Sequence, residues 1–335
     1  MAPAPERLVA LTPASPALAY APRIPARGRC SRAIRWSALV SLLLLGLGGC
    51  GRSGPGAPSG SRLRVITTVL PMTLFTRAVA EGCAEVEPLF PVTADPHEAQ
   101  ASPADLARLA RADVLVRNGL GLDASVDRFL ENGDRRLRVI DAGGPLLPQL
   151  SRGGAAGPVN PHVWLDPLLA VRQVELIRDG LIAAHPACQR RYLANASAFR
   201  ARLLALDGEL RRELAPYAGR RFVVFHSIAP YFSQRYGLRS VALVPGPEQE
   251  PSPADLQRVS QVVRAEGLRA LLAEPPGATG SLAALARDLK LEVLIFDPLE
   301  ISPGLGSGQL PGHYLETMRR NGRQLVRSFG GTPAG

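Results

Sequence analysis

Three of the five histidines in this 335-residue sequence stand where an apolar run gives way to a loop. His97 lies in "DPHE", shortly after one such run and before a helix-start signal, and His162 lies in "NPHVWLDP", just before another helix. His226 ends the run "RFVVFH", and an acid, Asp297, ends "EVLIFD" in the same manner. In open α/β sheets, ligands bind beyond the carboxyl ends of the strands. We therefore expect these four side chains to meet at one site.

Three imidazoles and one carboxylate form a donor set that suits a borderline divalent metal ion. The neutral nitrogen donors supply affinity, the carboxylate offsets charge, and four ligands complete a tetrahedral shell. Zinc is the metal that we expect first. The other two histidines, His185 in a turn and His313 beside the last predicted helix, are expected to have no metal role.

The elements that must position these residues are short apolar runs separated by amphipathic helical segments, a pattern typical of parallel sheets with covered faces. The runs form two sets of four, at 63–69, 86–90, 113–119 and 136–141, and then at 221–226, 240–245, 270–275 and 292–297. Between the sets lie a helix over 167–184 and a long polar segment whose leucines, at 203, 204, 206 and 210, recur at helical spacing.

These patterns predict an α/β fold of two lobes, each a mainly parallel sheet with flanking helices, joined by one long rigid backbone helix. We expect the N-terminal lobe to cover residues 63–188, the linking helix 189–216 and the C-terminal lobe 217–330.

The pentapeptide "SPADL" occurs at Ser102 to Leu106 and again at Ser252 to Leu256. Serine at the N-cap, proline at the first helical position and aspartate at the third all favour a helix start. Each copy is followed by one helix and one strand in the predicted order. We expect the two copies to open corresponding helices in two related lobes, although five residues alone are also compatible with the same capping sequence arising twice.

Residues 1–49 have the character of a leader. Arg-rich sequence precedes the apolar run in "WSALVSLLLLGLGGC", which is too short to span a bilayer and resembles an export signal. The glycines before Cys50 resemble the bacterial lipobox, in which that cysteine is lipidated, and residues 50–62 resemble a flexible tether. We expect an exported protein, periplasmic or at the cell surface, anchored to the membrane surface by a lipid on Cys50. An ordinary signal peptide is the alternative.

Two cysteines remain in the folded part, Cys83 and Cys188. Export implies an oxidising compartment in which they can pair. Each follows a predicted helix that descends from the same end of the sheet, but the sequence does not give the distance between them. A disulfide and two separate buried thiols both stay open.

The formal net charge of +10 invites a nucleic-acid interpretation, but residues 1–49 carry half of it, with six Arg and one Glu. The other arginines are scattered among acids, as in "RRELAPYAGRR", and form no basic face with interleaved aromatics. We expect no nucleic-acid partner. A zinc hydrolase is also disfavoured, because HExxH and GxSxG motifs are absent and Asp297 would close the position that catalytic zinc keeps open for water.

At these residues the chain resembles the metal-binding solute-binding lipoproteins of bacterial zinc and manganese ABC importers. The resemblance covers about residues 63–330, and its motifs, in order, are "DPHE" with "SPADLARLARADVLVRNGLGLD", "NPHVWLDP", "FHSIAPYFSQRYGL", "EPSPADLQRVSQVVRAEGLRALLAEP" and "LEVLIFDPL". It implies two α/β lobes with a rigid linking helix, ligands at His97, His162, His226 and Asp297, and partners in a membrane permease and its ATPase. We expect a monomer that is not an enzyme.

Departures from the family pattern bear on the metal. The His- and acid-rich loop of many zinc specialists is missing, since residues 119–161 contain no His, and the second lobe has no Cys pair. Manganese specialists often have Glu at the third ligand position, whereas His226 is a softer nitrogen donor that favours zinc. We expect zinc as the transported ligand, with manganese or iron(II) as the alternative. A metal-stabilised adhesin-like lipoprotein is a further alternative with the same site.

Overall fold

The computed structural model describes residues 62–131, 136–150, 159–277, 280–302 and 310–333. All of them belong to a single structural unit. The predicted leader, Cys50 and nearly all of the predicted tether lie outside the described residues. Within the described part of the chain, no helix is both long and apolar enough to cross a membrane.

The first lobe is built on a four-stranded, fully parallel sheet with strand order β2-β1-β3-β4. Its strands are β1 (Leu63–Thr67), β2 (Ala84–Pro88), β3 (Val114–Arg117) and β4 (Arg138–Asp141). Its helices are α1 (Leu70–Ala80), α2 (Pro103–Leu109), α3 (Ala124–Glu131), the short α4 (Leu147–Leu150) and α5 (Pro167–Ala184).

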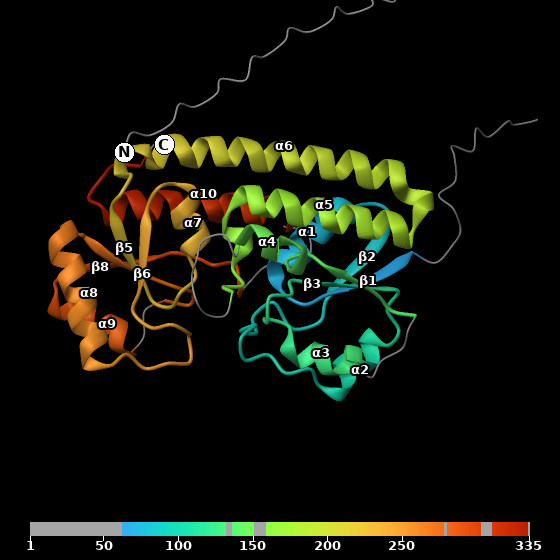
Figure 1. Ribbon diagram of the computed structural model, residues 1–335, viewed down its shortest axis with the longest axis horizontal. Coiled ribbons are helices and arrows are strands. Elements are labelled where there is room, and N and C mark those ends of the chain that lie inside the picture. Colours follow the sequence, from blue (N-terminus) through green and yellow to red (C-terminus); the bar gives the residue numbers. More distant parts are fainter. Residues whose placement is uncertain (1–61, 132–135, 151–158, 278–279, 303–309, 334–335) are drawn as a thin grey trace, which may run out of the picture. The chain divides into compact units, whose positions relative to one another are not determined.

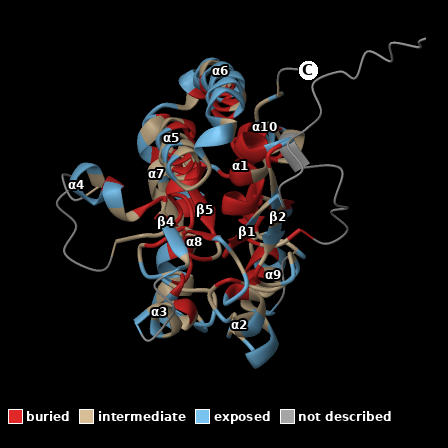
Figure 2. Cartoon of the chain, turned by 90° about the vertical axis from the view of Figure 1, so that its right-hand side faces the viewer, coloured by how far each residue is buried: buried red, intermediate tan, exposed pale blue. Residues whose placement is uncertain are grey.

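Side chains alternate across this sheet and so divide its core into two layers. Ile66 and Leu115 form one cluster with Leu109 of α2 and Val126 of α3. Their neighbours along the strands, such as Val65, belong to the main core with α1 and α5. Helices therefore cover both faces, as the predominantly apolar strands predicted (Figures 1 and 2).

The second lobe repeats this plan with the strand order β6-β5-β7-β8, again fully parallel. Its strands are β5 (Arg221–Val224), β6 (Arg239–Ala242), β7 (Ala270–Ala273) and β8 (Glu292–Ile295). Its helices are α7 (Pro230–Arg235), α8 (Pro253–Glu266), α9 (Gly280–Asp288) and α10 (Leu310–Ser328). The strands of both lobes are thus arranged in the same spatial order within their sheets, and the α/β fold class is confirmed.

Helix α6 (Gln189–Leu214) links the lobes and runs along both of them (Figure 1). It buries one stripe at helical spacing, formed by Tyr192, Ala196, Phe199, Leu203, Leu206, Leu210 and Leu214. Near its start, Arg191 and Asn195 donate hydrogen bonds to main-chain oxygens of the first lobe at 2.8 and 3.0 Å. Near its end, Asp207 and Glu209 pair with arginines of α7 and α10 in the second lobe.

The two "SPADL" segments open α2 and α8 in the same way. Ser102 and Ser252 are N-caps in extended conformation, and each accepts a hydrogen bond from the main-chain N–H of the aspartate three residues on. Those aspartates, Asp105 and Asp255, accept from the main-chain N–H of their serine in return, which completes a capping box. Corresponding helices of the two lobes thus begin with the same local chemistry.

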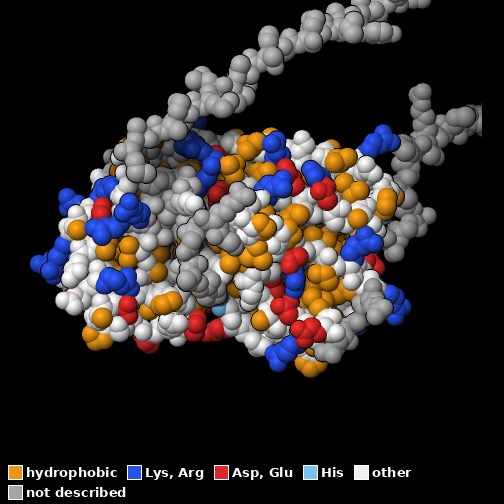
Figure 3. Space-filling view, viewed as in Figure 1, with side chains coloured by type: hydrophobic (Ala, Val, Ile, Leu, Met, Phe, Trp, Pro, Cys, Tyr) orange, Lys and Arg blue, Asp and Glu red, His pale blue; other side chains and the backbone are white. Residues whose placement is uncertain are grey.

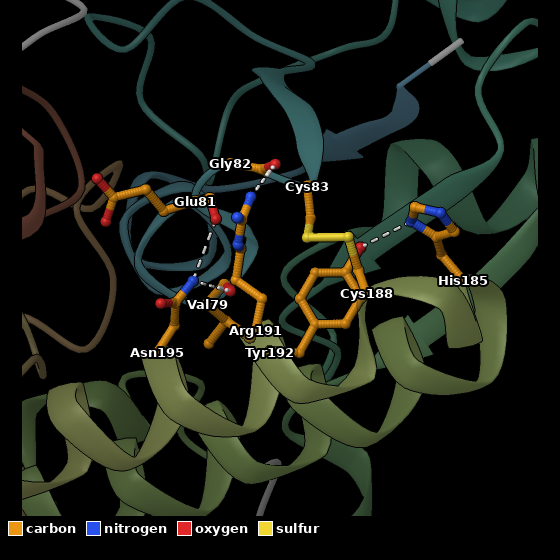
Figure 4. Close-up of a disulfide and its surroundings, with 9 residues drawn as sticks. All are labelled: Val79, Glu81, Gly82, Cys83, His185, Cys188, Arg191, Tyr192 and Asn195. Atoms are coloured by element: carbon orange, nitrogen blue, oxygen red, sulfur yellow. Dashed lines mark hydrogen bonds between the residues drawn. A yellow bond between two sulfur atoms is a disulfide. The ribbon is translucent and has the colours of Figure 1, made fainter. Parts of the chain in front are cut away.

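Cys83 and Cys188 form a disulfide, which decides between the two possibilities left open by the sequence. Cys83 lies between α1 and β2, and Cys188 immediately precedes α6 (Figure 4). The bridge spans a sequence separation of 105 residues. It fastens the start of the linking helix to the first lobe, beside the hydrogen bonds of Arg191 and Asn195 (Figure 4).

Candidate metal centre

The three predicted histidines converge between the lobes. His97 lies in the loop between β2 and α2, His162 precedes the short 3-10 turn before α5, and His226 closely follows β5. Their ring centroids are 5.3 to 5.4 Å apart. Segments that follow strands of both sheets thus bring the three imidazoles together in one cluster.

A fourth side chain completes this cluster, and it is Glu300. One oxygen, Oε1, lies 2.8 Å from Nε2 of His97 and 2.7 Å from Nε2 of His162. One donor atom from each of the three histidines and from Glu300 lies within 4.8 Å of the others. The Glu300 side chain is only 7% exposed, and those of His162 and His226 are 2% exposed, so the group is largely shielded from water.

Asp297, the predicted fourth member, does not join the group, and that prediction is wrong. Its carboxylate accepts a hydrogen bond from the main-chain N–H of Leu299 at 2.8 Å and another from Arg320 at 3.2 Å. The loop after β8 therefore turns back on Asp297, with Leu299 in the left-handed region at φ 64°. This turn places Glu300, three residues further on, in the cluster. Asp297 shapes the loop, and Glu300 supplies the carboxylate.

Neighbouring groups fix the orientation of the histidine rings. The Oδ1 of Asn160 lies 2.9 Å from Nδ1 of His162, and Oε2 of Glu274 lies 2.6 Å from Nδ1 of His226. The same Oδ1 of Asn160 also accepts the main-chain N–H of His162, and the other carboxylate oxygen of Glu274, Oε1, accepts the main-chain N–H of His226, at 3.1 Å in both cases. With Nδ1 facing an acceptor, Nε2 of each ring is directed into the cluster, the arrangement in which a histidine binds a metal.

The charges in the cluster reinforce one another. Burial alone lowers the pKa of His97, but the hydrogen bond and negative charge of Glu300, aided by Asp95 and Glu248, raise it above its ordinary value. Burial raises the pKa of Glu300, yet its close electrostatic and hydrogen-bond interactions with His162, together with the hydrogen bond to His97, lower that pKa well below its usual range. Glu300 is therefore an anion at neutral pH and attracts cations to this position.

The residues present fit a divalent transition metal. They offer three nitrogen donors and one carboxylate oxygen, which is the ligand number and chemistry of a closed tetrahedral zinc site. The Nε2 of His226 is buried and has no hydrogen-bond partner among the described residues. A buried polar atom without a partner is costly, and a metal ion bound at Nε2 would remove that cost.

An open cleft of about 790 Å³ leads to the cluster. Its walls come from both lobes, with Asn160 and Leu122 on one side and Tyr231 and Glu248 on the other. All three clustered histidines line it, so the cleft is the side from which an ion would approach them.

His185 and His313 lie outside the cluster. His185 has its Nδ1 3.3 Å from the Tyr192 hydroxyl, and Nε2 of His313 lies 3.2 Å from the Ser302 hydroxyl. Neither belongs to a group of potential metal ligands in the described part of the chain.

Three polar residues of the site were not predicted from the sequence, namely Glu300, Glu274 and Asn160. Each stands close to a position that was singled out. Glu274 follows the last residue of β7, Asn160 precedes His162 by two residues, and Glu300 follows Asp297 by three. An acid or an amide close to each singled-out residue could have indicated a hydrogen-bond partner for an imidazole. Which of these side chains faces which histidine depends on the fold.

Replacing Glu274 with Gln is expected to weaken metal binding by about 10- to 100-fold, because loss of the carboxylate beside a ligand imidazole lowers the basicity of that ring. A titration of Zn²⁺ against a competing chelator measures this change. A matched control is Glu250→Gln, which alters a carboxylate of the same lobe that is not in the cluster. Equal affinities of the two variants would show that Glu274 does not support His226.

The comparison with protein families identifies one matching model, "ZnuA: Zinc-uptake complex component A periplasmic", over residues 65–328. The zinc-binding lipoprotein AdcA of Streptococcus pneumoniae is 29% identical over 307 residues, which is 87% of this chain and 60% of AdcA. This chain therefore spans about 60% of the length of that relative. The manganese-binding lipoprotein MntA of Halalkalibacterium halodurans is 26% identical over 262 residues, covering 77% of this chain and 86% of MntA.

Among solved structures, the Zn(II)-bound ZnuA-like domain of S. pneumoniae AdcA is similar with a TM-score of 0.69 and 30% identity. The match covers 80% of this chain and 99% of that domain. The similarity therefore extends over both lobes and the linking helix.

Proposed function

This chain belongs to the ZnuA family, and we propose that it is the extracytoplasmic solute-binding protein of an ABC importer that captures a divalent transition metal, with zinc favoured. The observation that carries this proposal is the group of His97, His162, His226 and Glu300, whose donor atoms lie within 4.8 Å of one another. Two of these ligands come from each lobe, so the metal bridges the cleft and favours the state in which the lobes are together.

The donor set supports zinc over manganese. Three imidazoles are softer donors than the carboxylates, carbonyls and waters that suit manganese. The relatives include both zinc-binding and manganese-binding lipoproteins, so family membership alone does not identify the metal. The preference for zinc over manganese therefore rests on the three uncharged nitrogen donors of this site.

Transport fits this arrangement better than catalysis does. A catalytic zinc keeps one coordination position open for water, whereas Glu300 supplies a fourth ligand here. The metal ion is then transported and must be released from all four ligands. We infer that a membrane permease accepts it and that ATP is hydrolysed on another chain.

The proposed location is outside the cytoplasm, on a membrane surface. The disulfide between Cys83 and Cys188 supports it, because structural disulfides persist in oxidising compartments. We infer that Cys50 bears the lipid anchor. Incorporation of a labelled fatty acid by the wild type, and its loss in Cys50→Ala, would test the anchor.

On the face in Figure 3, Lys and Arg side chains lie at separate places, with Asp and Glu close to several of them. The described part of this face thus lacks a continuous basic stripe of the kind that tracks a nucleic-acid backbone.

Metal content tests the proposed function directly. The purified protein is stripped with chelator, offered Zn²⁺, Mn²⁺ and Fe²⁺ in equal amounts, and measured by mass spectrometry. One zinc per chain is the expected result. One manganese or iron per chain would keep the site and change the cargo, and the absence of any stoichiometric metal would overturn the proposal.

Zinc affinity is expected to fall on acidification. A ligand imidazole must be neutral, so protons compete with the metal. Because Glu300 raises the pKa of His97, the protonated form of this ring persists to higher pH than in a free histidine. Each displaced proton costs roughly tenfold in affinity per pH unit, so a fall from about pH 7.5 to about pH 5.5 should weaken binding roughly 100-fold. Chelator competition at both pH values measures it, and an unchanged affinity would contradict the three-histidine site.

A further inference from the structure

Asn160 is the one residue of the described cleft wall that both orients a ligand imidazole and bonds to the opposite lobe. Its Oδ1 accepts from the main-chain N–H and faces Nδ1 of His162, in its own lobe, at 3.1 and 2.9 Å. Its Nδ2 donates to the main-chain oxygen of Ser227, and its own main-chain oxygen accepts from the Tyr231 hydroxyl at 2.9 Å. Ser227 and Tyr231 belong to the second lobe. Every polar side-chain atom of Asn160 is thus engaged.

The partners of Asn160 are themselves tied to the metal cluster. Ser227 directly follows His226, and Tyr231 lies in the first turn of α7, four residues later. The two hydrogen bonds across the cleft therefore join the chain segment that carries His162 to the segment that carries His226. We call Asn160, Ser227 and Tyr231 the clasp.

The clasp differs in position from the buried hydrogen bonds that Trp164 makes between the lobes. Trp164 donates to the main-chain oxygen of Pro298 and accepts at its own oxygen from Tyr314, both at 2.7 Å, but Trp164 and Tyr314 are fully buried. These bonds belong to the continuous core beneath the site. Asn160, Ser227 and Tyr231 are only partly buried and line the open cleft. Separation of the cleft walls would break the clasp before it disturbed the core.

We propose that the clasp is a positioning device that slows release of the metal, and that Tyr231 and Asn160 set the rate at which the site opens. This inference rests on the proposed function. The bonds of the clasp form only when the lobes are together, so they stabilise the closed state and add nothing to the open state that first meets an ion. Their loss should accelerate dissociation and leave association nearly unchanged.

Tyr231→Phe tests the proposal with a minimal change, because it removes one hydroxyl and leaves the aromatic ring on the cleft wall. The protein is loaded with Zn²⁺ and mixed with an excess of a chromogenic chelator in a stopped-flow instrument, which gives the release rate. Loss of one hydrogen bond between uncharged groups predicts release about three- to tenfold faster. The association rate, measured by competition with a zinc dye, should stay within about twofold of the wild type.

Tyr192→Phe is the matched control. It removes a tyrosine hydroxyl in α6, beside His185 and away from the cleft, and should release zinc at the wild-type rate. Asn160→Ala is the second variant, because it removes the bond to Ser227 and the acceptor for His162 together. We expect it to release zinc about 10- to 100-fold faster than the wild type.

The outcomes separate the clasp from the metal site. Faster release in both cleft variants, with association unchanged, supports the clasp. A release rate for Tyr231→Phe equal to that of Tyr192→Phe, while the wild type binds one zinc, overturns the clasp and leaves the proposed function intact. Slower association together with lower thermal stability would show a general structural role instead, and would also overturn it. A wild type that binds no metal would overturn both proposals.

Discussion

Replacement of Glu300 by Gln is expected to lower the affinity for Zn²⁺ by about two orders of magnitude. Four-ligand zinc sites provide roughly 10–16 kcal/mol, or about 3 kcal/mol per ligand, and each 1.4 kcal/mol is about a tenfold change in affinity. Gln has nearly the same shape as Glu but removes the only carboxylate of the cluster, whose oxygen lies 2.8 and 2.7 Å from two imidazoles. Chelator competition at neutral pH measures the effect.

Asp297→Asn is the control that distinguishes Glu300 from the residue predicted by the sequence. Asn retains an oxygen that can accept the Leu299 N–H, so the turn that presents Glu300 is kept. We expect this variant to bind zinc within about tenfold of the wild type. If Asp297→Asn lost more affinity than Glu300→Gln, the assignment of the fourth ligand would be reversed.

Removal of the disulfide is expected to lower the free energy of unfolding by about 2–5 kcal/mol. The bridge closes a long loop, with a sequence separation of 105 residues between Cys83 and Cys188, and such a cross-link restricts the unfolded chain strongly. It also holds the start of α6 against the first lobe. A Cys83→Ser/Cys188→Ser variant, unfolded with urea and followed by circular dichroism, measures the loss.

Reductant provides the control for this prediction. Treatment of the wild type with a thiol reductant should lower its stability to that of the double variant, and the double variant itself should not respond. A double variant as stable as the oxidised wild type would show that the cross-link contributes nothing to the folded state. Zinc must be absent from both samples, because a ligand that binds only the native state adds to its apparent stability.

Much of the fold was predictable because its signals are local. Eight apolar runs and two capping sequences indicated two α/β lobes, and the long helix was indicated by leucines at helical spacing. The second strand shows the limit of such reasoning. Residues 86–90 were predicted, but β2 is Ala84–Pro88, because its register with β1 pairs Ala84 with Leu63. Leu89 lies beyond the end of β2 and packs with Ile66 in the core layer that α2 and α3 cover. Pairing with a neighbouring strand, which sequence patterns do not contain, decided the boundary.

The site shows the same division between local and non-local information. The expectation that His97, His162 and His226 meet rested on a general property of parallel sheets, although only His226 closely follows its strand, while His97 and His162 lie further along the segments after β2 and β4. The exchange of Asp297 for Glu300 depended on a single turn, in which Leu299 adopts a positive φ that is rare for a residue with a branched side chain. The pairing of Glu274 with His226 likewise required knowledge of which loops face each other, whereas Asn160 contacts His162 within one loop.

The anchoring of α6 at both ends limits how the cleft can open. Asn195 and the disulfide attach its first two turns to one lobe, while Asp207 and Glu209 attach its last two turns to the other. The helix is therefore attached at both ends, and its central turns also pack into the core through Phe199, Leu203 and Leu206. An uninterrupted helix bends gently rather than folding at a point. We therefore expect the two lobes to move relative to one another by a small angle only, and a metal ion would have to enter and leave the cleft within that range of motion.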